Sequence, residues 1–209
     1  MKFEECAIDR LRKQVSESMS EKRFRHTAAV EQMAVRLAAI YVPQKTDVLR
    51  VAALLHDITK EYSTQRQLQI CREFGIRISK QDILTPKTFH AKTAAAIIPS
   101  QYPEFADAEV ISAVRWHTTG RSEMGLLEKL LYLADYIDES RTFADCVALR
   151  ALFWDAEPQS MSEEQRRQHL NRILVRSFDM TLSGLIEEGA PISEHTFSAR
   201  NALLLELHS

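Results

Sequence analysis

The stretch VLRVAALLHDITK, residues 48–60, carries apolar side chains on almost every side of the helix that its spacing predicts. A helix that is apolar all round packs in the middle of a fold, with other elements on every face. Thr46 or Asp47 is expected to cap its first turn. Near its end the stretch carries the adjacent pair His56-Asp57, two ionisable side chains in the most apolar helix of the chain. This pattern therefore predicts that the helix lies at the centre of the fold.

Helical periodicity continues on both sides of this segment. Apolar residues recur every four positions from Phe3 to Val15, and a second helix is expected from about Ser20 until just before Pro43. The remaining helices are expected over residues 64–75, 88–98, 107–117, 123–138 and 162–189, with loops over 76–87, 99–106 and 155–161. Strand-like alternation of apolar and polar residues is absent from the sequence.

Two of these helices carry a capping-box signature at their start, in the pairs Thr64–Gln67 and Ser162–Gln165. With so regular a pattern, we predict an all-α fold in a single domain, residues 1–209. Residues 160–209 are expected to pack on it as a separate C-terminal helical layer.

Composition excludes several classes of protein. Five Gly and six Pro in 209 residues disfavour β-sandwiches, barrels and glycine-rich phosphate loops. The 27 basic and 29 acidic residues nearly cancel and form no basic block, so no nucleic-acid partner is expected. No run of 18 apolar residues occurs, which predicts no membrane span. The three cysteines are far apart and odd in number, as in proteins of a reducing compartment, so we expect a cytoplasmic location.

Six ionisable side chains interrupt the apolar faces of five expected helices. They are His26, His56, Asp57, His90, His117 and Asp135. A single inward His is usually a core residue with a satisfied hydrogen bond, and each Asp has a structural interpretation as an ion pair with Arg23 or Arg141. The whole set favours a divalent metal, because burying carboxylates is costly and a metal supplies both charge and coordination.

The order H…HD…H…H…D of these six residues resembles the HD-domain metal-dependent phosphohydrolases. The setting ALLHDITK (53–60), preceded by RFRHT (23–27), strengthens this resemblance. Three further strings narrow it to the YqeK-type branch of symmetrical bis(5'-nucleosyl)-tetraphosphatases, which split dinucleoside tetraphosphates such as diadenosine tetraphosphate into two ADP. They are RWHTTGR (115–121), LLEKLLYLADYIDESR (126–141) and TFSARN (196–201). The resemblance implies an HD core over about residues 20–140 and a helical extension over about 160–209 that closes the nucleotide site.

The resemblance also implies a metal site and a catalytic centre. The expected ligands of an iron ion are His26, His56, Asp57 and Asp135. His90 and His117 match positions that complete a second metal site or face the phosphates. Imidazole and carboxylate ligands also suit manganese, and ligand type alone does not choose between the two metals. Asp57, Lys60, His90 and His117 are the expected catalytic residues; Asp57 with one free oxygen can accept a proton from the attacking water.

The substrate contacts follow from the same resemblance. Arg23, Lys60 and Arg141 are expected at the phosphates, with Thr118 near them. The segment expected to close over the nucleoside consists of Thr196, Phe197, Ser198, Ala199, Arg200 and Asn201. The implied partners are a dinucleoside polyphosphate substrate and the ADP product.

Two other functions stay open at this point. The chain can be another HD phosphohydrolase, acting on nucleoside mono-, tri- or guanosine polyphosphates. It can also be a catalytically idle helical module that binds a nucleotide and uses metal only for structure. The sequence leaves the oligomeric state open, a homodimer included.

Overall fold

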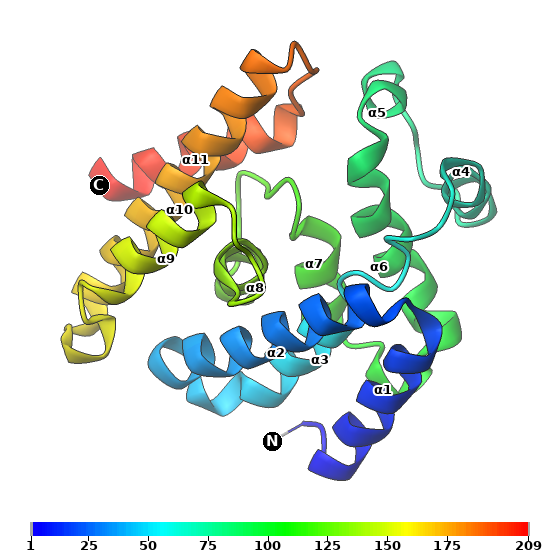
Figure 1. The fold of residues 1–209 in the computed structure, drawn as a ribbon, viewed down its shortest axis with the longest axis horizontal. Helices are drawn as coiled ribbons and strands as arrows, with labels where there is room; N and C mark the ends of the chain where they lie inside the picture. Colours follow the sequence, from blue (N-terminus) through cyan, green and yellow to red (C-terminus); the bar gives the residue numbers. More distant parts are fainter. Residues whose placement is uncertain (1, 209) are drawn as a thin grey trace.

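The computed structural model describes residues 2–208, with residue 81 described by its backbone alone, and every regular element in this range is helical (Figure 1). The all-α prediction is therefore confirmed. The α-helices are α1 (Glu5–Ser18), α2 (Glu21–Tyr41), α3 (Thr46–Leu55), α4 (Thr64–Glu73), α5 (Lys80–Leu84), α6 (Phe89–Gln101), α7 (Ala108–Trp116), α8 (Leu126–Ile137), α9 (Ala144–Trp154), α10 (Glu163–Glu187) and α11 (Glu194–His208). Four short 3-10 turns, each beginning at a Pro, are η1 (Pro43–Lys45), η2 (Pro86–Thr88), η3 (Pro103–Phe105) and η4 (Pro158–Ser160).

Helix α3 occupies the centre of the molecule, as its sequence predicts. It contacts α1, α2, α7 and α8, and Leu49, Leu54 and Leu55 are each 0% exposed. Burying a leucine side chain completely contributes about 1.5–3 kcal/mol to stability. The central helix thus packs against α2, α7 and α8, the helices that carry or precede His26, His117 and Asp135.

The C-terminal helices form a group of their own on one side of the bundle. Figure 1 shows α9, α10 and α11 together, with α4, α5 and α6 on the opposite side and α7 and α8 between them. Helices α10 and α11 pack against each other, and α10 also contacts α8 and α9. The division into a core of about 20–140 and an extension of about 160–209 stays a prediction, and residues 1 and 209, the ends of the expected domain, lie outside the described residues.

Several local expectations are wrong. The central helix ends at Leu55 instead of Lys60, because the chain then enters tight turns, with the Lys60 N–H bonded to the Asp57 carbonyl at 2.9 Å. Its first turn has no side-chain cap, since the Asp47 carboxylate instead accepts from the N–H of Phe3 at 2.7 Å.

The capping-box predictions have different outcomes. Helix α10 does open on the Ser162–Gln165 box. Helix α4 is capped one residue before the expected Thr64, by the side chain of Ser63.

Three helical segments differ from the expected pattern. Helix α6 runs through Pro99 to Gln101, into the expected loop 99–106. Helix α5 lies inside the expected loop 76–87, and α9 was not expected at all.

Gly120 brings the last helix onto the turn that follows α7. Its φ of +62° is left-handed, and a Cβ at this position would lie 2.8 Å from a ring carbon of Phe178 and 2.9 Å from the Cβ of Ala199. Glycine is thus required here for its backbone conformation and for its lack of a side chain. The close approach of Ala199 holds α11 against the segment that carries His117.

No helix between residues 2 and 208 has the length and apolar character needed to cross a bilayer.

Candidate metal centre and active site

The six inward ionisable residues meet where five helices begin or end. His26 lies in the second turn of α2, and His56-Asp57 directly follow α3. His90 is the second residue of α6, His117 directly follows α7, and Asp135 lies in the last turn of α8. The sequence therefore places on separate helix ends the side chains that the fold brings together.

Asp57 lies at the centre of this cluster, which consists of the six residues named above. Its Oδ1 is 3.2 Å from Nε2 of His90 and 3.8 Å from Nε2 of His117. Its Oδ2 is 3.5 Å from Nε2 of His56 and 3.8 Å from Nε2 of His26. One carboxylate thus faces all four imidazoles, and it is 4% exposed.

Asp135 forms the other acidic side of the cluster. Its Oδ1 is 3.0 Å from Nε2 of His26 and 4.0 Å from Nε2 of His56. Behind His26, the ring Nδ1 is 3.3 Å from Oδ2 of Asp138, which is fully buried. A carboxylate behind a ligating imidazole orients the ring and raises its basicity. Sequence reasoning missed Asp138, although its position three residues after Asp135 in LADYIDES was available as a signal.

The other three imidazoles are oriented by backbone carbonyls. Each uses its Nδ1 on the carbonyl three residues earlier, at 2.6 Å for His56, 2.8 Å for His90 and 2.7 Å for His117. A carbonyl only accepts, so the proton sits on Nδ1 and the lone pair of Nε2 points into the cluster. This is the tautomer that a ligand bonding through Nε2 requires.

The donor set fits a divalent cation. The buried Nε2 atom of His56 has no hydrogen-bond partner, which is costly unless something else binds it. Four groups of donors have ligand atoms within 4.8 Å of one another. They are His26–His56–Asp57, His56–His117–Asp135, Asp57–His90–His117 and His26–Asp135–Asp138.

Burial and neighbouring charges set the protonation of the imidazoles. Burial, together with the neighbouring His56, lowers the pKa of His117 to about 4, and burial also lowers that of His90. Burial acts in the same direction on His26, but hydrogen bonds with Asp135 and Asp138 outweigh it and raise the pKa to about 9. His26 must therefore release a proton to bind a cation, whereas His90 and His117 are neutral at pH 7.

Three cationic side chains border the cluster. Arg23 donates to Oδ2 of Asp57 at 2.8 Å, and Arg141 donates through Nε to the backbone carbonyl of Asp135 at 2.8 Å and forms an ion pair with its carboxylate. The ammonium of Lys60 lies 3.2 Å from Nε2 of His90, and burial lowers its pKa. The ion pairs that the structural interpretation expects are thus present, but they leave the convergence of four imidazole nitrogens unexplained.

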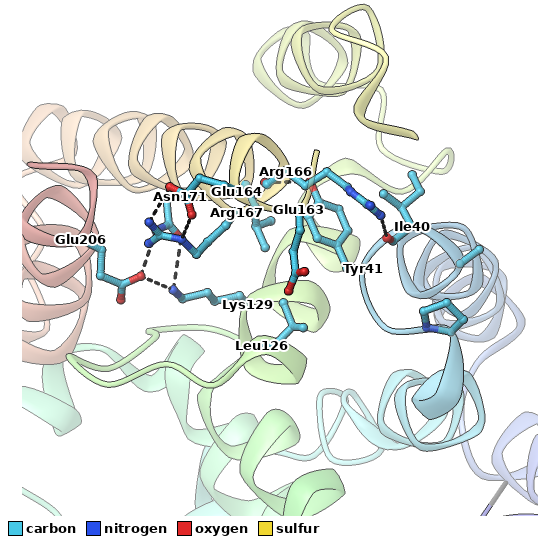
Figure 2. A pocket seen from close by; sticks show the side chains of 13 residues that line it. Ile40, Tyr41, Leu126, Lys129, Glu163, Glu164, Arg166, Arg167, Asn171 and Glu206 are labelled. Carbon is cyan, nitrogen blue, oxygen red and sulfur yellow. Dashed lines mark hydrogen bonds and ion pairs between the residues drawn. The ribbon is translucent and has the colours of Figure 1, made fainter. Parts of the chain in front are cut away.

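A cavity of about 430 Å³ opens beside the cluster. Four of the expected site residues line it, namely His117, Thr118, Asp135 and Arg141. A larger cavity, of about 800 Å³, lies elsewhere between α2, α8, α10 and α11 and contains none of the expected site residues (Figure 2). There the buried Lys129 is bonded to Glu206 at 2.7 Å and to Asn171 at 3.1 Å, so its charge is neutralised internally.

The segment 196–201 lies in the first half of α11, where Ala199 packs against Gly120. Thr196 and Ala199 are buried, and Arg200 forms an ion pair with Asp179 of α10 at 2.7 Å. Phe197 is 56% exposed. None of these six side chains lines the cavity of about 430 Å³. That they close over a nucleoside stays a prediction.

Known proteins match this chain over most of its length. The sequence profile of the HD domain matches residues 23–140. The chain belongs to the HD domain family. The match contains the whole cluster and two of the three bordering cations, Arg23 and Lys60; Arg141 lies one residue beyond it.

Within this family the similarity extends to whole relatives. A protein of Halalkalibacterium halodurans named "Bis(5'-nucleosyl)-tetraphosphatase, symmetrical" is 31% identical over 92% of this chain and 94% of its own length. A Bacillus subtilis protein of the same name is 29% identical over 91% of this chain and 94% of its own. The crystal structure of a "predicted HD superfamily hydrolase involved in NAD metabolism" from Clostridium acetobutylicum has a TM-score of 0.81 and 31% identity, over 95% of this chain and 97% of that one.

Proposed function

We propose that this chain hydrolyses symmetrical dinucleoside tetraphosphates at the central linkage, so that diadenosine tetraphosphate gives two ADP. The observation that carries this proposal is the cluster in which Asp57 faces four imidazoles oriented through Nε2. Such a donor set suits metal-assisted hydrolysis of phosphate esters. The two relatives named for this activity, each similar over more than nine-tenths of the chain, support the choice of substrate.

The HD domain implies a divalent metal, and we propose iron. His26, His56, Asp57 and Asp135 would hold it, with His90 and His117 positioned for a second ion or for phosphate oxygens. When bound, a divalent cation acidifies a coordinated water and polarises a phosphate oxygen. Nitrogen and carboxylate donors together are compatible with iron or manganese.

The protein residues around the cluster would position the phosphates and move the proton. An oxygen of Asp57 accepts a proton from the water that attacks phosphorus. Lys60, Arg23 and Arg141 stabilise the negative charge that grows on the phosphate oxygens. The bond from the attacked phosphorus to the central bridging oxygen breaks. One ADP leaves with that oxygen, and the other retains the oxygen of water.

The cleavage position depends on how far the attacked phosphorus lies from the held nucleoside. If residues 196–201 hold one adenosine and the phosphorus of its second phosphate is the one attacked at the cluster, the leaving group is ADP. We also propose a cytoplasmic location, because Cys6, Cys71 and Cys146 are free thiols, which persist in a reducing compartment.

Separation of the reaction products tests this proposal. The metal-loaded protein is incubated with diadenosine tetraphosphate, and the nucleotides are separated by chromatography. Two equivalents of ADP are expected. ATP and AMP in equal amounts would contradict cleavage at the centre, and turnover of other nucleotides in place of this substrate would favour another HD phosphohydrolase. Binding of nucleotide without any hydrolysis would favour the idle module.

A further inference from the structure

Phe143 is a large aromatic side chain at the catalytic cavity that the described residues leave largely exposed. It directly precedes α9, is 70% exposed and lines the cavity of about 430 Å³ together with Asp135 and Arg141. Phe89, Phe153 and Phe178, by contrast, are each 0% exposed. A bare ring on a cavity wall costs hydration free energy in the absence of a ligand that covers it.

The backbone that carries Phe143 is fixed from both sides. The guanidinium of Arg150 donates to the carbonyl of Ile137 at 2.7 Å and to that of Arg141 at 2.9 Å, so α9 holds the connection from α8. The carbonyl of Phe143 itself accepts from the N–H of Val147 at 3.0 Å in the first turn of α9. Hydrogen bonds to α9 therefore fix the backbone on both sides of the Phe143 ring.

We infer that Phe143 provides a stacking face for one of the two nucleobases of the substrate, an inference that rests on the proposed function. Arg141 lies two residues before Phe143 and bonds Asp135 of the cluster, so a phosphate-binding cation and a flat apolar ring share one wall. A nucleotide has the matching arrangement, an anionic phosphate chain joined to a flat aromatic base. Aromatic side chains bind bases by stacking on the flat face that every base has, and a purine offers a larger face than a pyrimidine.

A dinucleoside substrate requires two places for bases. The expected segment 196–201 accounts for one nucleoside, and its side chains do not line this cavity. Phe143 accounts for the other, because a polyphosphate that crosses the cluster continues past Arg141 toward it. Sequence reasoning missed this residue because an isolated Phe before an unexpected helix carries no periodic signal.

Substitution of the ring tests this assignment. The variants are Phe143→Ala, Phe143→Leu, which keeps an apolar side chain without an aromatic face, and Phe143→Trp, which keeps the face. Phe74→Ala is the matched control, since Phe74 is also exposed, at 45%, but lies at the end of α4 and lines none of the cavities described above. For each metal-loaded protein, calorimetry gives the affinity for the analogue of diadenosine tetraphosphate whose central bridging oxygen is replaced by methylene. Steady-state kinetics give KM and kcat for the natural substrate.

We expect Phe143→Ala and Phe143→Leu to weaken analogue binding and raise KM by about 5-fold to about 150-fold. kcat and metal content should stay near their wild-type values, and Phe143→Trp and Phe74→Ala should behave like wild type. The loss should be smaller for the diuridine compound, because a pyrimidine has less surface to stack.

Other outcomes overturn the assignment in distinguishable ways. Unchanged affinity in Phe143→Ala, or full rescue by Leu, refutes stacking while two-ADP hydrolysis by the wild type leaves the proposed function standing. A fall in kcat or metal content without a change in affinity would show that Phe143 stabilises the connection between α8 and α9 and does not stack on a base. A wild-type protein that binds the analogue but does not cleave diadenosine tetraphosphate refutes the proposed function, and the calorimetry still tests stacking.

Discussion

Replacing Asp57 by Asn separates metal binding from folding more sharply than any other change in the cluster. Asn keeps the shape of the side chain but removes the charge, and it leaves one neutral carbonyl oxygen, a weaker donor than a carboxylate. Because Asp57 faces all four imidazoles, with His90 nearest at 3.2 Å, its loss should reduce the metal content to background and abolish hydrolysis. The same change should leave the helices intact.

The expected loss of stability follows from the neighbours of the carboxylate. Breaking a fully buried ion pair costs about 3–5 kcal/mol. Here the side chain of the partner Arg23 is 28% exposed, so its charge can turn to water when Asp57 is replaced. The lowered pKa values of His90 and His117 keep these rings neutral, so the replacement leaves no unpaired charge on them. We therefore expect a loss of about 1–3 kcal/mol in the free energy of unfolding, out of about 5–15 kcal/mol for a typical protein.

The assay combines elemental analysis, circular dichroism and thermal unfolding, with chelator-treated wild type as the reference. Asp47→Asn is the matched control, because Asp47 is equally buried, at 4%, but accepts from the backbone of Phe3 far from the cluster. This control should lose stability and keep its metal. Full metal occupancy in Asp57→Asn would refute the assignment of the cluster, whatever the effect on activity.

Three further changes test other parts of the structure. Lys60→Ala should lower kcat by about 10²- to 10³-fold with little change in KM, as for other single donors to a developing charge; a change confined to KM would show that the ammonium beside His90 only binds ground-state phosphate. Gly120→Ala should cost about 1–3 kcal/mol in overpacking beyond the cost of Gly75→Ala, since both have positive φ but only at Gly120 does a Cβ meet atoms within 3 Å; equal melting temperatures would contradict this. Burial opposes the charge of Asp47, but backbone hydrogen bonds outweigh it and lower its pKa, so its contribution to stability is present above the ordinary pKa of about 4 and is lost as the pH falls through the lower value in the folded state. The loss of melting temperature between about pH 5 and about pH 3 should therefore be smaller in Asp47→Asn than in wild type, and identical acid profiles would contradict this origin.

Much of the fold follows from periodicity, and the misses have physical causes. The central helix is recognisable because its apolar residues leave no polar face, but its end is not, because the tight turns after Leu55 depend on local hydrogen bonds. Helix α9 (ADCVALRALFW) escaped prediction because exposed Val147 and Leu152 blur its apolar stripe. Helix α5 is only five residues long, and its signal is the Ser79–Asp82 capping box.

The site divides in the same way. The six cluster residues are identifiable because each is an ionisable group on an otherwise apolar helix face. Burying such a group costs free energy unless a partner compensates for it, which indicates a functional role. Asp138 and Phe143 are not identifiable in this way. Asp138 lies just beyond the last residue of α8, outside the helical periodicity, and the position of Phe143 depends on a connection held by Arg150. A residue that orients another side chain, as Asp138 does, or that lies exposed at a cavity, as Phe143 does, is not detected from the helical periodicity of apolar residues.

The ends of helices explain how the histidines at these positions are oriented toward the cluster. The last four carbonyls of a helix have no partner within it, and His56 and His117 directly follow α3 and α7. Each ring bonds one of these free carbonyls, Ala53 or Val114, and is thereby fixed in the tautomer that points Nε2 away from the helix. The same hydrogen bond satisfies a buried carbonyl at the helix end and orients the ring as a ligand bonding through Nε2 requires. A histidine one turn earlier would face a carbonyl that already accepts a hydrogen bond within the helix. The end of α3 at Leu55 therefore determines the orientation of the His56 ring as well as its location.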